Sequence, residues 1–367
     1  MKFRCDRDLL SEALQTVQRG VSTRPGIPAL TGVLMTVGEG RLALTTTDLE
    51  VTVEEGVPVD AREEGSALVP ARLLADMVKA LPPDAVDFET DGSQAKVMCR
   101  SFEGTLRCLA AEDFPAVRDV QGTKITAEAG PFAQGVGQVA RAASRDEARP
   151  VLTGVLMEAN REGLTLAATD SYRLAVREIR ATGEGEARAL VPERAISEAG
   201  RAAAGEEKGE VEIVLGDAQA VFRVGSLRLT SRLIDGEFPN YRQLLPEPGE
   251  NRLSANSQEL LEAVRRVGLL ARESSPVRLE LNALGVRLTS SSPDLGGAVE
   301  AVEASYQGEE LTAAFNPNYF GDGLQGVTGE RATVELRDGL KPALIRGEGD
   351  DAFTYLVMPV RLPAPVG

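Results

Sequence analysis

The chain contains no histidine. This absence removes Ser-His-Asp and Cys-His catalysis, imidazole acid–base chemistry and most zinc sites. The three cysteines, Cys5, Cys99 and Cys108, form no CxxC pair, and we expect reduced, mostly buried thiols. We therefore expect no catalytic residue, no metal site and no cofactor.

Two glycine-rich stretches leave a nucleotide-binding repeat enzyme as the alternative. GDGLQG (321–326) matches GxGxxG, and GVGQVA (135–140) matches its GxGxxA variant. Both signals are weak, because the second begins inside an amphipathic helix pattern and parallel βαβ units are missing. None of the six lysines follows a glycine-rich loop with Ser or Thr after it. Asp48 and Asp170 could form an acid pair, but each is expected to cap the turn after a strand.

The elements that carry these residues recur along the chain. TGVLM occurs at 31–35 and again at 153–157, 122 residues later. At the same offset, ALVPARLLADMVKAL (67–81) corresponds to ALVPERAISEAGRAA (189–203). A weaker third copy contains AAFNPNYF (313–320) and YLVMP, which ends at Pro359. These matches predict three units that share one fold.

The sequence pattern predicts the same order of helices and strands in each of the three units. A helix opens it, alternating strands follow, a second helix begins at a proline, and a hairpin closes it. The fold class is therefore α+β, with two helices packed on antiparallel sheets in each of three repeated domains. Glycine- and proline-rich linkers predict the boundaries. The expected domains are 1–120, 121–247 and 248–367, the last with a short tail at 363–367.

Composition sets the broad class. Apolar residues make up 43% of 367, which is enough for real cores. There is no run of eighteen apolar residues and no signal-peptide stretch at MKFRCDRDLL, so we expect a cytoplasmic protein without a membrane partner. A net charge of −16 and the absence of tryptophan argue against an evenly basic or base-stacking nucleic-acid binder.

Basic residues nevertheless gather on the outer faces of the predicted helices. On a wheel of about 100° per residue they lie opposite the apolar stripes. The outward residues are Arg19, Arg72, Lys79, Gln134, Gln138, Arg141, Arg145, Arg194, Arg201, Arg265 and Arg266. Arg72 and Arg194 recur at the domain offset, as do Lys79 and Arg201. A plain structural repeat scaffold, the third alternative, explains the fold but not these repeated basic faces.

The whole chain to Leu362 resembles the bacterial DNA polymerase III beta subunit, or beta sliding clamp, family. The motifs that carry the resemblance are TRPGIPALTGVLM (23–35), ATDSYRLA (168–175), LIDGEFPNYRQLLP (233–246), FNPNYF (315–320) and YLVMPVRL (355–362). It implies a non-catalytic DNA sliding clamp and processivity factor, in which three clamp-fold domains form half of a closed ring. Two chains join head to tail around double-stranded DNA, without reading its sequence.

A size estimate agrees with two chains. Twelve helices spaced ~10 Å apart leave a bore of about 28 Å around a duplex roughly 20 Å wide, whereas six leave about 9 Å. Partners implied by the resemblance are the replicative polymerase, the clamp loader and repair proteins with short Gln- and Leu/Phe-containing motifs.

The resemblance also assigns three groups of residues. The expected DNA contacts are Arg24, Arg72, Lys79, Arg141, Arg145, Arg149, Arg194, Arg201, Arg265 and Arg266. The groove for partner peptides comprises Leu152, Thr169, Ser171, Tyr172, Arg173, Leu174, Pro239, Gln243, Leu244, Asn316, Tyr319, Leu356, Val357, Met358, Pro359, Val360, Arg361 and Leu362. The dimer seam comprises Leu106, Leu269, Leu270, Glu300 and Glu303.

Two features of this chain depart from the family pattern. FGDGLQGV (320–327) is a poor helix former without Lys or Arg, so we expect the second helix of the third domain to be short. The tail 363–367 runs past the family's usual ending and can reach over the groove.

Overall fold

The computed structural model describes residues 1–22, 26–206, 208–247, 249–271, 276–294 and 296–361. Arg24, Leu362 and the tail 363–367 therefore lie outside the described residues. The chain divides into two compact units, each formed by two segments. Unit 1 comprises residues 1–129 and 201–233, and unit 2 comprises residues 130–200 and 234–367.

The order of elements repeats three times along the chain, as the sequence predicts. The first repeat comprises β1 (Lys2–Asp6), α1 (Arg7–Val17), β2 (Gly32–Gly38), β3 (Arg41–Thr47), β4 (Val51–Pro58), β5 (Asp60–Glu63), β6 (Gly65–Pro70), α2 (Ala71–Ala80), β7 (Ala85–Thr90), β8 (Gln94–Cys99) and β9 (Phe102–Arg107). The second comprises β10 (Thr123–Glu128), α3 (Ala129–Val139), β11 (Gly154–Ala159), β12 (Gly163–Thr169), β13 (Arg173–Gly183), β14 (Ala187–Pro192), α4 (Glu193–Gly205), β15 (Glu210–Leu215), β16 (Gln219–Val224) and β17 (Leu227–Arg232).

The third repeat follows the same order. It comprises β18 (Asn251–Asn256), α5 (Ser257–Gly268), β19 (Val277–Asn282), β20 (Gly285–Ser292), β21 (Gly296–Val302), β22 (Ala304–Gln307), β23 (Leu311–Phe315), α6 (Pro317–Gly326), β24 (Arg331–Leu336), β25 (Ala343–Gly347) and β26 (Asp350–Val357). Short 3-10 helices lie at Gln18–Gly20, Pro28–Thr31, Ala111–Asp113, Ala140–Ala142, Pro150–Leu152 and Tyr241–Gln243.

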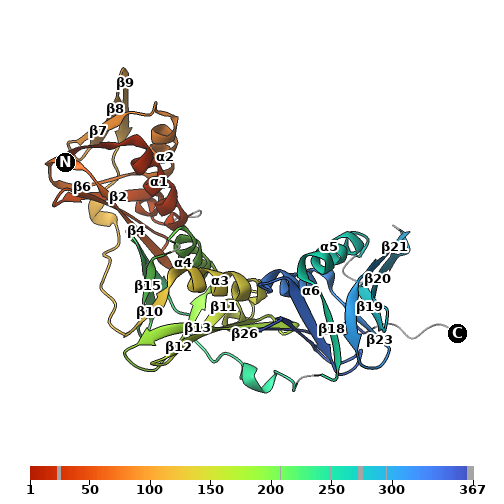
Figure 1. The fold of residues 1–367 in the computed structure, drawn as a ribbon. Helices are drawn as coiled ribbons and strands as arrows, with labels where there is room; N and C mark the ends of the chain where they lie inside the picture. Colours follow the sequence, from red (N-terminus) through yellow and green to blue (C-terminus); the bar gives the residue numbers. More distant parts are fainter. Residues whose placement is uncertain (23–25, 207, 248, 272–275, 295, 362–367) are drawn as a thin grey trace. The chain divides into compact units, whose positions relative to one another are not determined.

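Unit 1 contains two antiparallel sheets. The smaller has the order β5-β1-β7-β8-β9. The larger has the order β10-β15-β16-β17-β4-β3-β2-β6, so that β4 of the first repeat pairs with β17 of the second. Helices α1 and α2 pack side by side, α1 on β3 and β4 and α2 on β2 and β6 (Figure 1).

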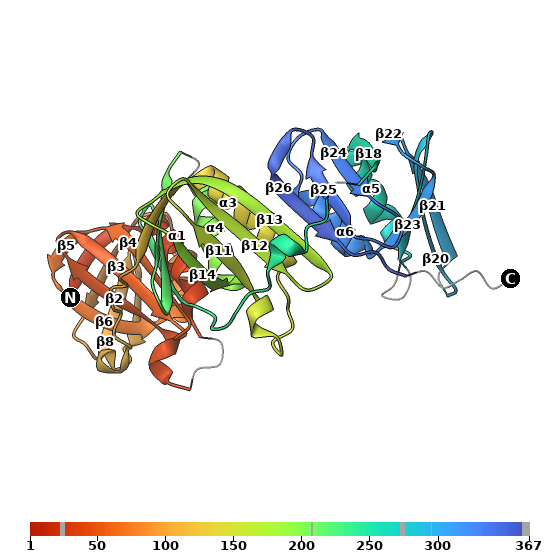
Figure 2. The same cartoon turned by 90° about the horizontal axis from the view of Figure 1, so that it is seen from below.

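Unit 2 follows the same plan. Its larger sheet has the order β14-β11-β12-β13-β26-β25-β24-β18-β22, so that β13 of the second repeat pairs with β26 of the third. The smaller sheet has the order β21-β20-β19-β23. Figure 2 shows α5 and α6 of this unit between strands of the two sheets. Both joints between repeats are thus made by strand pairing within a unit.

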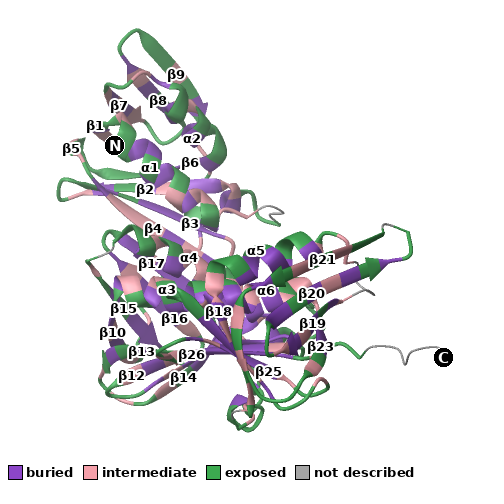
Figure 3. Cartoon of the chain, turned by 45° about the vertical axis from the view of Figure 1, so that its right-hand side comes forward, coloured by how far each residue is buried: buried purple, intermediate pink, exposed green. Residues whose placement is uncertain are grey.

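The helix faces largely follow the predicted stripes. Apolar stripe residues such as Leu10, Leu74 and Leu260 are buried, and the outer faces are exposed (Figure 3). The prediction for Gln138 is wrong, because this side chain was expected to face outward but is only 4% exposed. Its Nε2 donates to the Gly326 carbonyl at 2.6 Å, so this face of α3 is covered by the end of α6.

The prediction of a short α6 is also wrong. The helix spans ten residues, the same length as α2. Asn316 caps it by accepting hydrogen bonds from the backbone N–H groups of Asn318 and Tyr319. Its glycines allow close packing, since a Cβ on Gly323 would lie 2.5 Å from the Tyr355 ring. Tertiary packing therefore overrides the low helix propensity of this segment.

We expect Gly323→Ala to destabilise the protein by about 1–3 kcal/mol, because the added methyl group cannot fit against Tyr355 without moving the helix. Gly321→Ala is the matched control, since a Cβ there is 3.8 Å from Leu261. It should stabilise the helix by up to ~1 kcal/mol. Urea unfolding of both variants checks this, and equal midpoints would contradict the packing explanation.

Candidate functional site

The turn between β12 and β13 presents the first group of candidate residues. Asp170 caps this turn, because its Oδ1 accepts hydrogen bonds from the backbone N–H groups of Tyr172 at 2.9 Å and Arg173 at 3.1 Å. Ser171 has a φ of 82°, a left-handed conformation that a tight turn requires. The result is an exposed Tyr172 side chain beside a partly buried Arg173.

Asp48 has the same role between β3 and β4. Its Oδ1 accepts from the backbone N–H groups of Glu50 at 3.1 Å and Val51 at 2.8 Å. The predicted capping role of both aspartates is confirmed. Each carboxylate is thus engaged in its own turn, and the acid-pair alternative loses its basis.

Arg173 connects this turn to α6. Its Nε donates to Asp170 at 2.9 Å, and Nη1 forms an ion pair with Asp322. The guanidinium carbon also lies 4.4 Å above the centre of the Tyr319 ring, which stacks at 6.4 Å with Tyr172. The Arg173 side chain is only 11% exposed, so its charge needs both carboxylates. Burial, followed by the Asp170 charge, raises the pKa of Tyr319.

A cavity of about 490 Å³ opens beside this network. It is lined by Ala143, Ser144, Arg145, Asp146, Arg149, Asp170, Tyr172, Arg173, Asn318, Tyr319 and Asp322. Two groups that the sequence treats separately therefore meet here, the arginines assigned to DNA and the residues assigned to the groove. Arg149 pairs with Asp146 at 2.9 Å and donates to Ser171 at 3.1 Å, which ties it to the groove.

An apolar region of unit 2 contains two of the predicted groove residues, Leu174 and Leu356. Its buried cluster comprises Leu156, Ala167, Leu174, Val176, Leu190, Phe238, Tyr241, Leu344 and Leu356. Phe238, Tyr241 and Leu344 pack in this cluster but are not among the predicted groove residues. Tyr241 is fixed by donating its hydroxyl to Glu158 at 2.9 Å.

The predicted groove residues differ in accessibility. Leu152, Thr169, Leu174, Leu356 and Val357 are buried, so they support the surface from below. The exposed apolar residues among them are Tyr172, Leu244, Met358 and Val360. Pro239, Gln243 and Arg361 are also exposed, whereas Asn316, Tyr319 and Pro359 are half-buried.

Backbone hydrogen bonds fix the segment that follows β26. The Met358 N–H donates to the Tyr172 carbonyl at 2.8 Å, and the Val360 N–H donates to the Ala314 carbonyl at 2.7 Å. The exposed Met358 side chain is thus held beside the β12–β13 turn. This arrangement joins the exposed apolar residues to the rim of the cavity.

The basic residues of the helices are exposed, with one exception. Arg72, Lys79, Arg145, Arg194, Arg201, Arg265 and Arg266 lie on the surface. Arg141 is half-buried, donating to the Gly137 carbonyl at 2.8 Å and lying 3.9 Å from Asp322. Arg266 pairs with Glu300 at 2.6 Å. Arg141 and Arg266 are therefore committed to carboxylates of their own chain.

The predicted seam residues fall on two edge strands and one helix end. Leu106 is 4% exposed, so its side chain is part of the core of unit 1 and not of the surface. It belongs to β9, which pairs with β8 at the edge of its sheet. Glu300 belongs to β21, which pairs with β20 at the edge of the other small sheet. Glu303 directly follows β21 and is exposed. Leu269 is 80% exposed at the end of α5, and Leu270 is half-buried.

The remaining sequence predictions concern chemistry. Cys5 and Cys99 are buried and Cys108 is half-buried, in line with the expectation of mostly buried thiols. Burial raises the pKa of the Cys5 thiol to about 12. GDGLQG lies inside α6, and most of GVGQVA lies inside α3, so neither forms a strand-to-helix phosphate turn. Among the described residues no three His, Cys, Asp or Glu side chains are placed to hold a metal ion.

No described helix combines the length and the apolar character that crossing a bilayer requires.

Comparison with known proteins gives matches along the whole chain. Family models for the DNA polymerase III beta subunit match residues 1–118 (N-terminal domain), 127–240 (central domain) and 242–361 (C-terminal domain). The beta sliding clamp of Streptomyces coelicolor is 38% identical over 99% of this chain and 100% of its own. That of Synechococcus elongatus is 33% identical, with the same coverage.

Solved structures agree. The crystal structure of a sliding clamp from Pseudomonas aeruginosa bound to griselimycin has a TM-score of 0.93 to this chain and 33% sequence identity. The match covers 99% of this chain and 100% of that one. The fold prediction, three repeated α+β domains of the clamp type, is confirmed.

A second ion pair, between Arg177 on β13 and Asp350 on β26, leads to a test by pH. Arg177 donates to the Asp350 carboxylate at 2.7 and 3.0 Å, and Thr328 donates at 3.0 Å. Burial alone would raise the pKa of Asp350, but these hydrogen bonds outweigh it and hold the pKa below its usual range. The ionised carboxylate therefore favours the folded state.

The stabilisation should be fully present above about pH 4, the ordinary Asp range, and be lost as pH falls through the lower folded pKa. Asp350→Asn should cost about 1–3 kcal/mol at pH 7 and lose less stability than the parent on acidification. Thermal unfolding from pH 7 to pH 3 measures both. Parallel pH curves would contradict this role for Asp350.

Proposed function

We propose, from the premise that the chain belongs to the DNA polymerase III beta subunit family, that it encircles duplex DNA as a head-to-tail homodimer and tethers partner proteins through the groove of unit 2. The family is the sliding clamp, a non-catalytic processivity subunit. The observation that carries the proposal is the match to all three family domains, in order, along almost the entire chain. A cytoplasmic location is part of the same proposal.

The basic helix faces supply the proposed contacts to DNA. A ring that slides must avoid base-specific hydrogen bonds, because each would hold it at one site by about 1–3 kcal/mol. Exposed Arg and Lys side chains on helices meet this need, since they attract phosphate without reading sequence. Arg24 remains part of the proposal but lies outside the described residues.

The ion pairs suggest a ranking among these contacts. Arg72, Lys79 and Arg145 are exposed and make no ion pair with the described residues. Arg149 and Arg266 are already paired with carboxylates of the chain. We expect the first three to contact phosphate more strongly, because they lose no existing ion pair when they do so.

The groove supplies the proposed contacts to partner peptides. Exposed Met358, Leu244 and Val360 form an adaptable apolar surface. The cavity beside Tyr172 and Arg173 adds polar groups that can orient a peptide. This combination suits a short motif that contains both an amide and an apolar side chain, as in the proposed polymerase, clamp-loader and repair partners.

Two edge strands of the smaller sheets, β9 and β21, support the proposed dimer seam. Strands β9 and β21 each have one side without a partner strand in the described chain. Each also exposes an apolar side chain, Phe102 at 40% and Val299 at 61%. Pairing β9 of one protomer with β21 of the other would satisfy both edges. The domain boundaries 1–120, 121–247 and 248–367 belong to this proposal as well.

Retention on DNA tests the proposed function. After loading, the protein should remain on a closed circular duplex and escape quickly once the circle is cut, because enclosure and not affinity holds it. A double variant, Arg72→Ala with Lys79→Ala, should keep this difference, since removing two charges does not open a ring. Gel filtration of DNA-bound protein measures the lifetimes. Equal lifetimes on cut and closed DNA would rule out enclosure.

Binding of a polymerase peptide tests the groove. Met358→Ala should weaken binding of a Gln- and Leu/Phe-containing peptide by at least tenfold, or about 1.4 kcal/mol or more, because it removes an exposed apolar contact. The control is Leu284→Ala, a side chain 92% exposed in the β19–β20 turn. Fluorescence anisotropy gives both affinities, and sedimentation shows whether each variant is still a dimer. Unchanged affinity for Met358→Ala would refute the groove.

A further inference from the structure

The groove of unit 2 has a counterpart in unit 1 that follows from the internal repeat. In unit 2 the β12–β13 turn, the end of β26 and the linker FPNYR (238–242) meet. In unit 1 the equivalent segments, which are the β3–β4 turn, β17 and the linker FPAVR (114–118), meet around a cavity of about 120 Å³. The two sites have the same backbone plan.

Strand register identifies the equivalent positions. In unit 2, Thr169 pairs with Leu174, and Leu174 pairs with Leu356. In unit 1, Thr47 pairs with Thr52, and Thr52 pairs with Thr230. Two leucines of the groove are thus replaced by threonines in its counterpart. The apolar floor of one site is a row of hydroxyl groups in the other.

The lining of the smaller cavity is correspondingly polar. It comprises Thr47, Thr52, Pro115, Ala116, Val117, Arg118, Gln219 and Thr230. Thr47 donates to the Val51 carbonyl at 3.2 Å and lies 2.9 Å from the Thr52 hydroxyl, so these two hydroxyls satisfy each other. Thr230 is 5% exposed, and its Oγ1 has no hydrogen-bond partner in the part of the chain that the structure describes. A buried hydroxyl left in this state costs stability unless something binds it.

Arg118 adds a positive charge that is not paired with a carboxylate of the described chain, unlike its counterpart in unit 2. Arg242, the equivalent residue, pairs with Glu158 at 2.7 Å. Thr36 stands where Glu158 would be, since it pairs with Ala43 and Ser66 as Glu158 pairs with Thr165 and Arg188. Within the described chain Arg118 therefore has no carboxylate partner.

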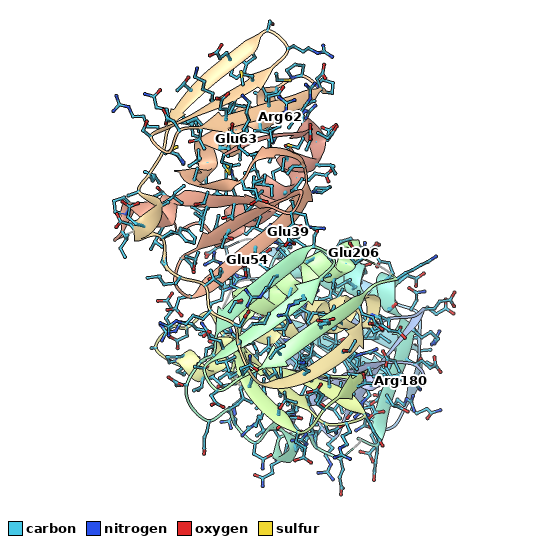
Figure 4. All side chains as sticks on the ribbon, turned by 90° about the vertical axis from the view of Figure 1, so that its left-hand side faces the viewer. Glu39, Glu54, Arg62, Glu63, Arg180 and Glu206 are labelled. Carbon is cyan, nitrogen blue, oxygen red and sulfur yellow. The ribbon has the colours of Figure 1, made fainter. Side chains whose placement is uncertain are left out.

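The neighbouring arginines are already paired with carboxylates of the chain. Arg228 pairs with Glu54, which Figure 4 labels on β4, and also with Asp119 at 3.3 Å. Arg232 pairs with Glu50 at 3.3 Å. Arg118 is the charged residue in the cavity lining, and it has no ion pair with the described residues. Gln219 contributes a side-chain amide without a hydrogen-bond partner in the described residues.

We propose that this cavity binds a single carboxylate side chain from an extended acidic segment of a partner protein. Arg118, Gln219 and Thr230 all line this small cavity, each has a side-chain donor, and a carboxylate accepts several hydrogen bonds at once. The volume equals about four water molecules at ~30 Å³ each, which suits one Asp or Glu side chain and not a longer motif.

A matched pair of peptides tests the site in the full-length protein. Acetyl-Gly-Glu-Gly-amide should shift the backbone amide signals of Thr52, Gln219 and Thr230 in a labelled sample. Arg118→Gln should weaken this binding at least tenfold, and Thr230→Val at least threefold. Arg242→Gln is the control for a lost surface charge and should leave the binding unchanged, as should Met358→Ala. The site therefore stands or fails separately from the groove of unit 2.

Three results would overturn the proposal. One is equal binding by the parent and Arg118→Gln. Another is stronger binding of acetyl-Gly-Leu-Gly-amide, which would make this site a second apolar groove. The third is the absence of any shift at the solubility limit of the peptide, which would assign the cavity to water. Thermal unfolding of each variant shows whether it is folded, so that a loss of binding is not mistaken for loss of structure.

Discussion

The arrangement of the chain depends on one interaction, the pairing of a strand at the edge of one repeat with the last strand of the next repeat. Strand β4 pairs with β17, and β13 pairs with β26. This pairing satisfies backbone N–H and C=O groups that an open edge would leave without partners. Each of these strands directly follows a tight turn, the β3–β4 turn before β4 and the β12–β13 turn before β13. The strand pairing therefore places each turn beside the last strand of the next repeat. Both candidate binding sites lie where this happens.

Ion pairs cross both joints between repeats, the β4–β17 pairing and the β13–β26 pairing, with the positive charge on the same repeat each time. The second repeat supplies the arginines, and its neighbours supply the carboxylates, as in Arg228 with Glu54 and Arg177 with Asp350. Partly buried pairs of this kind add little net stability, because desolvation offsets the attraction. Removing one partner would nevertheless leave an uncompensated charge. Their main contribution is therefore to fix which strands pair, and so to keep the turn residues in register with the neighbouring repeat.

The sequence predicts what is local or repeated, and fails where distant segments pack. The offset of 122 residues locates the helices and hairpins, and it identifies Asp48 and Asp170 as turn residues. A helical wheel places Gln138 outside because it cannot include α6, which covers that face. The length of α6 was underestimated because its glycines pack against Tyr355 and Phe353, far along the chain. For the same reason the sequence did not place Phe238 and Tyr241 in one cluster with Leu174 and Leu356.

The two joints show how one backbone plan can present different chemistry. The turn is held alike in both, since Thr47 and Thr169 occupy the same register and Asp48 and Asp170 make the same backbone hydrogen bonds. The side chains at the two cross-strand positions, Leu174 and Leu356 in one joint and Thr52 and Thr230 in the other, are free to differ, because backbone hydrogen bonds and the ion pairs hold the strands together. Leucines there create an apolar surface, whereas threonines beside an unpaired arginine create a site for an anion. The repeat therefore fixes where binding sites form, and a few cross-strand positions decide what each can bind.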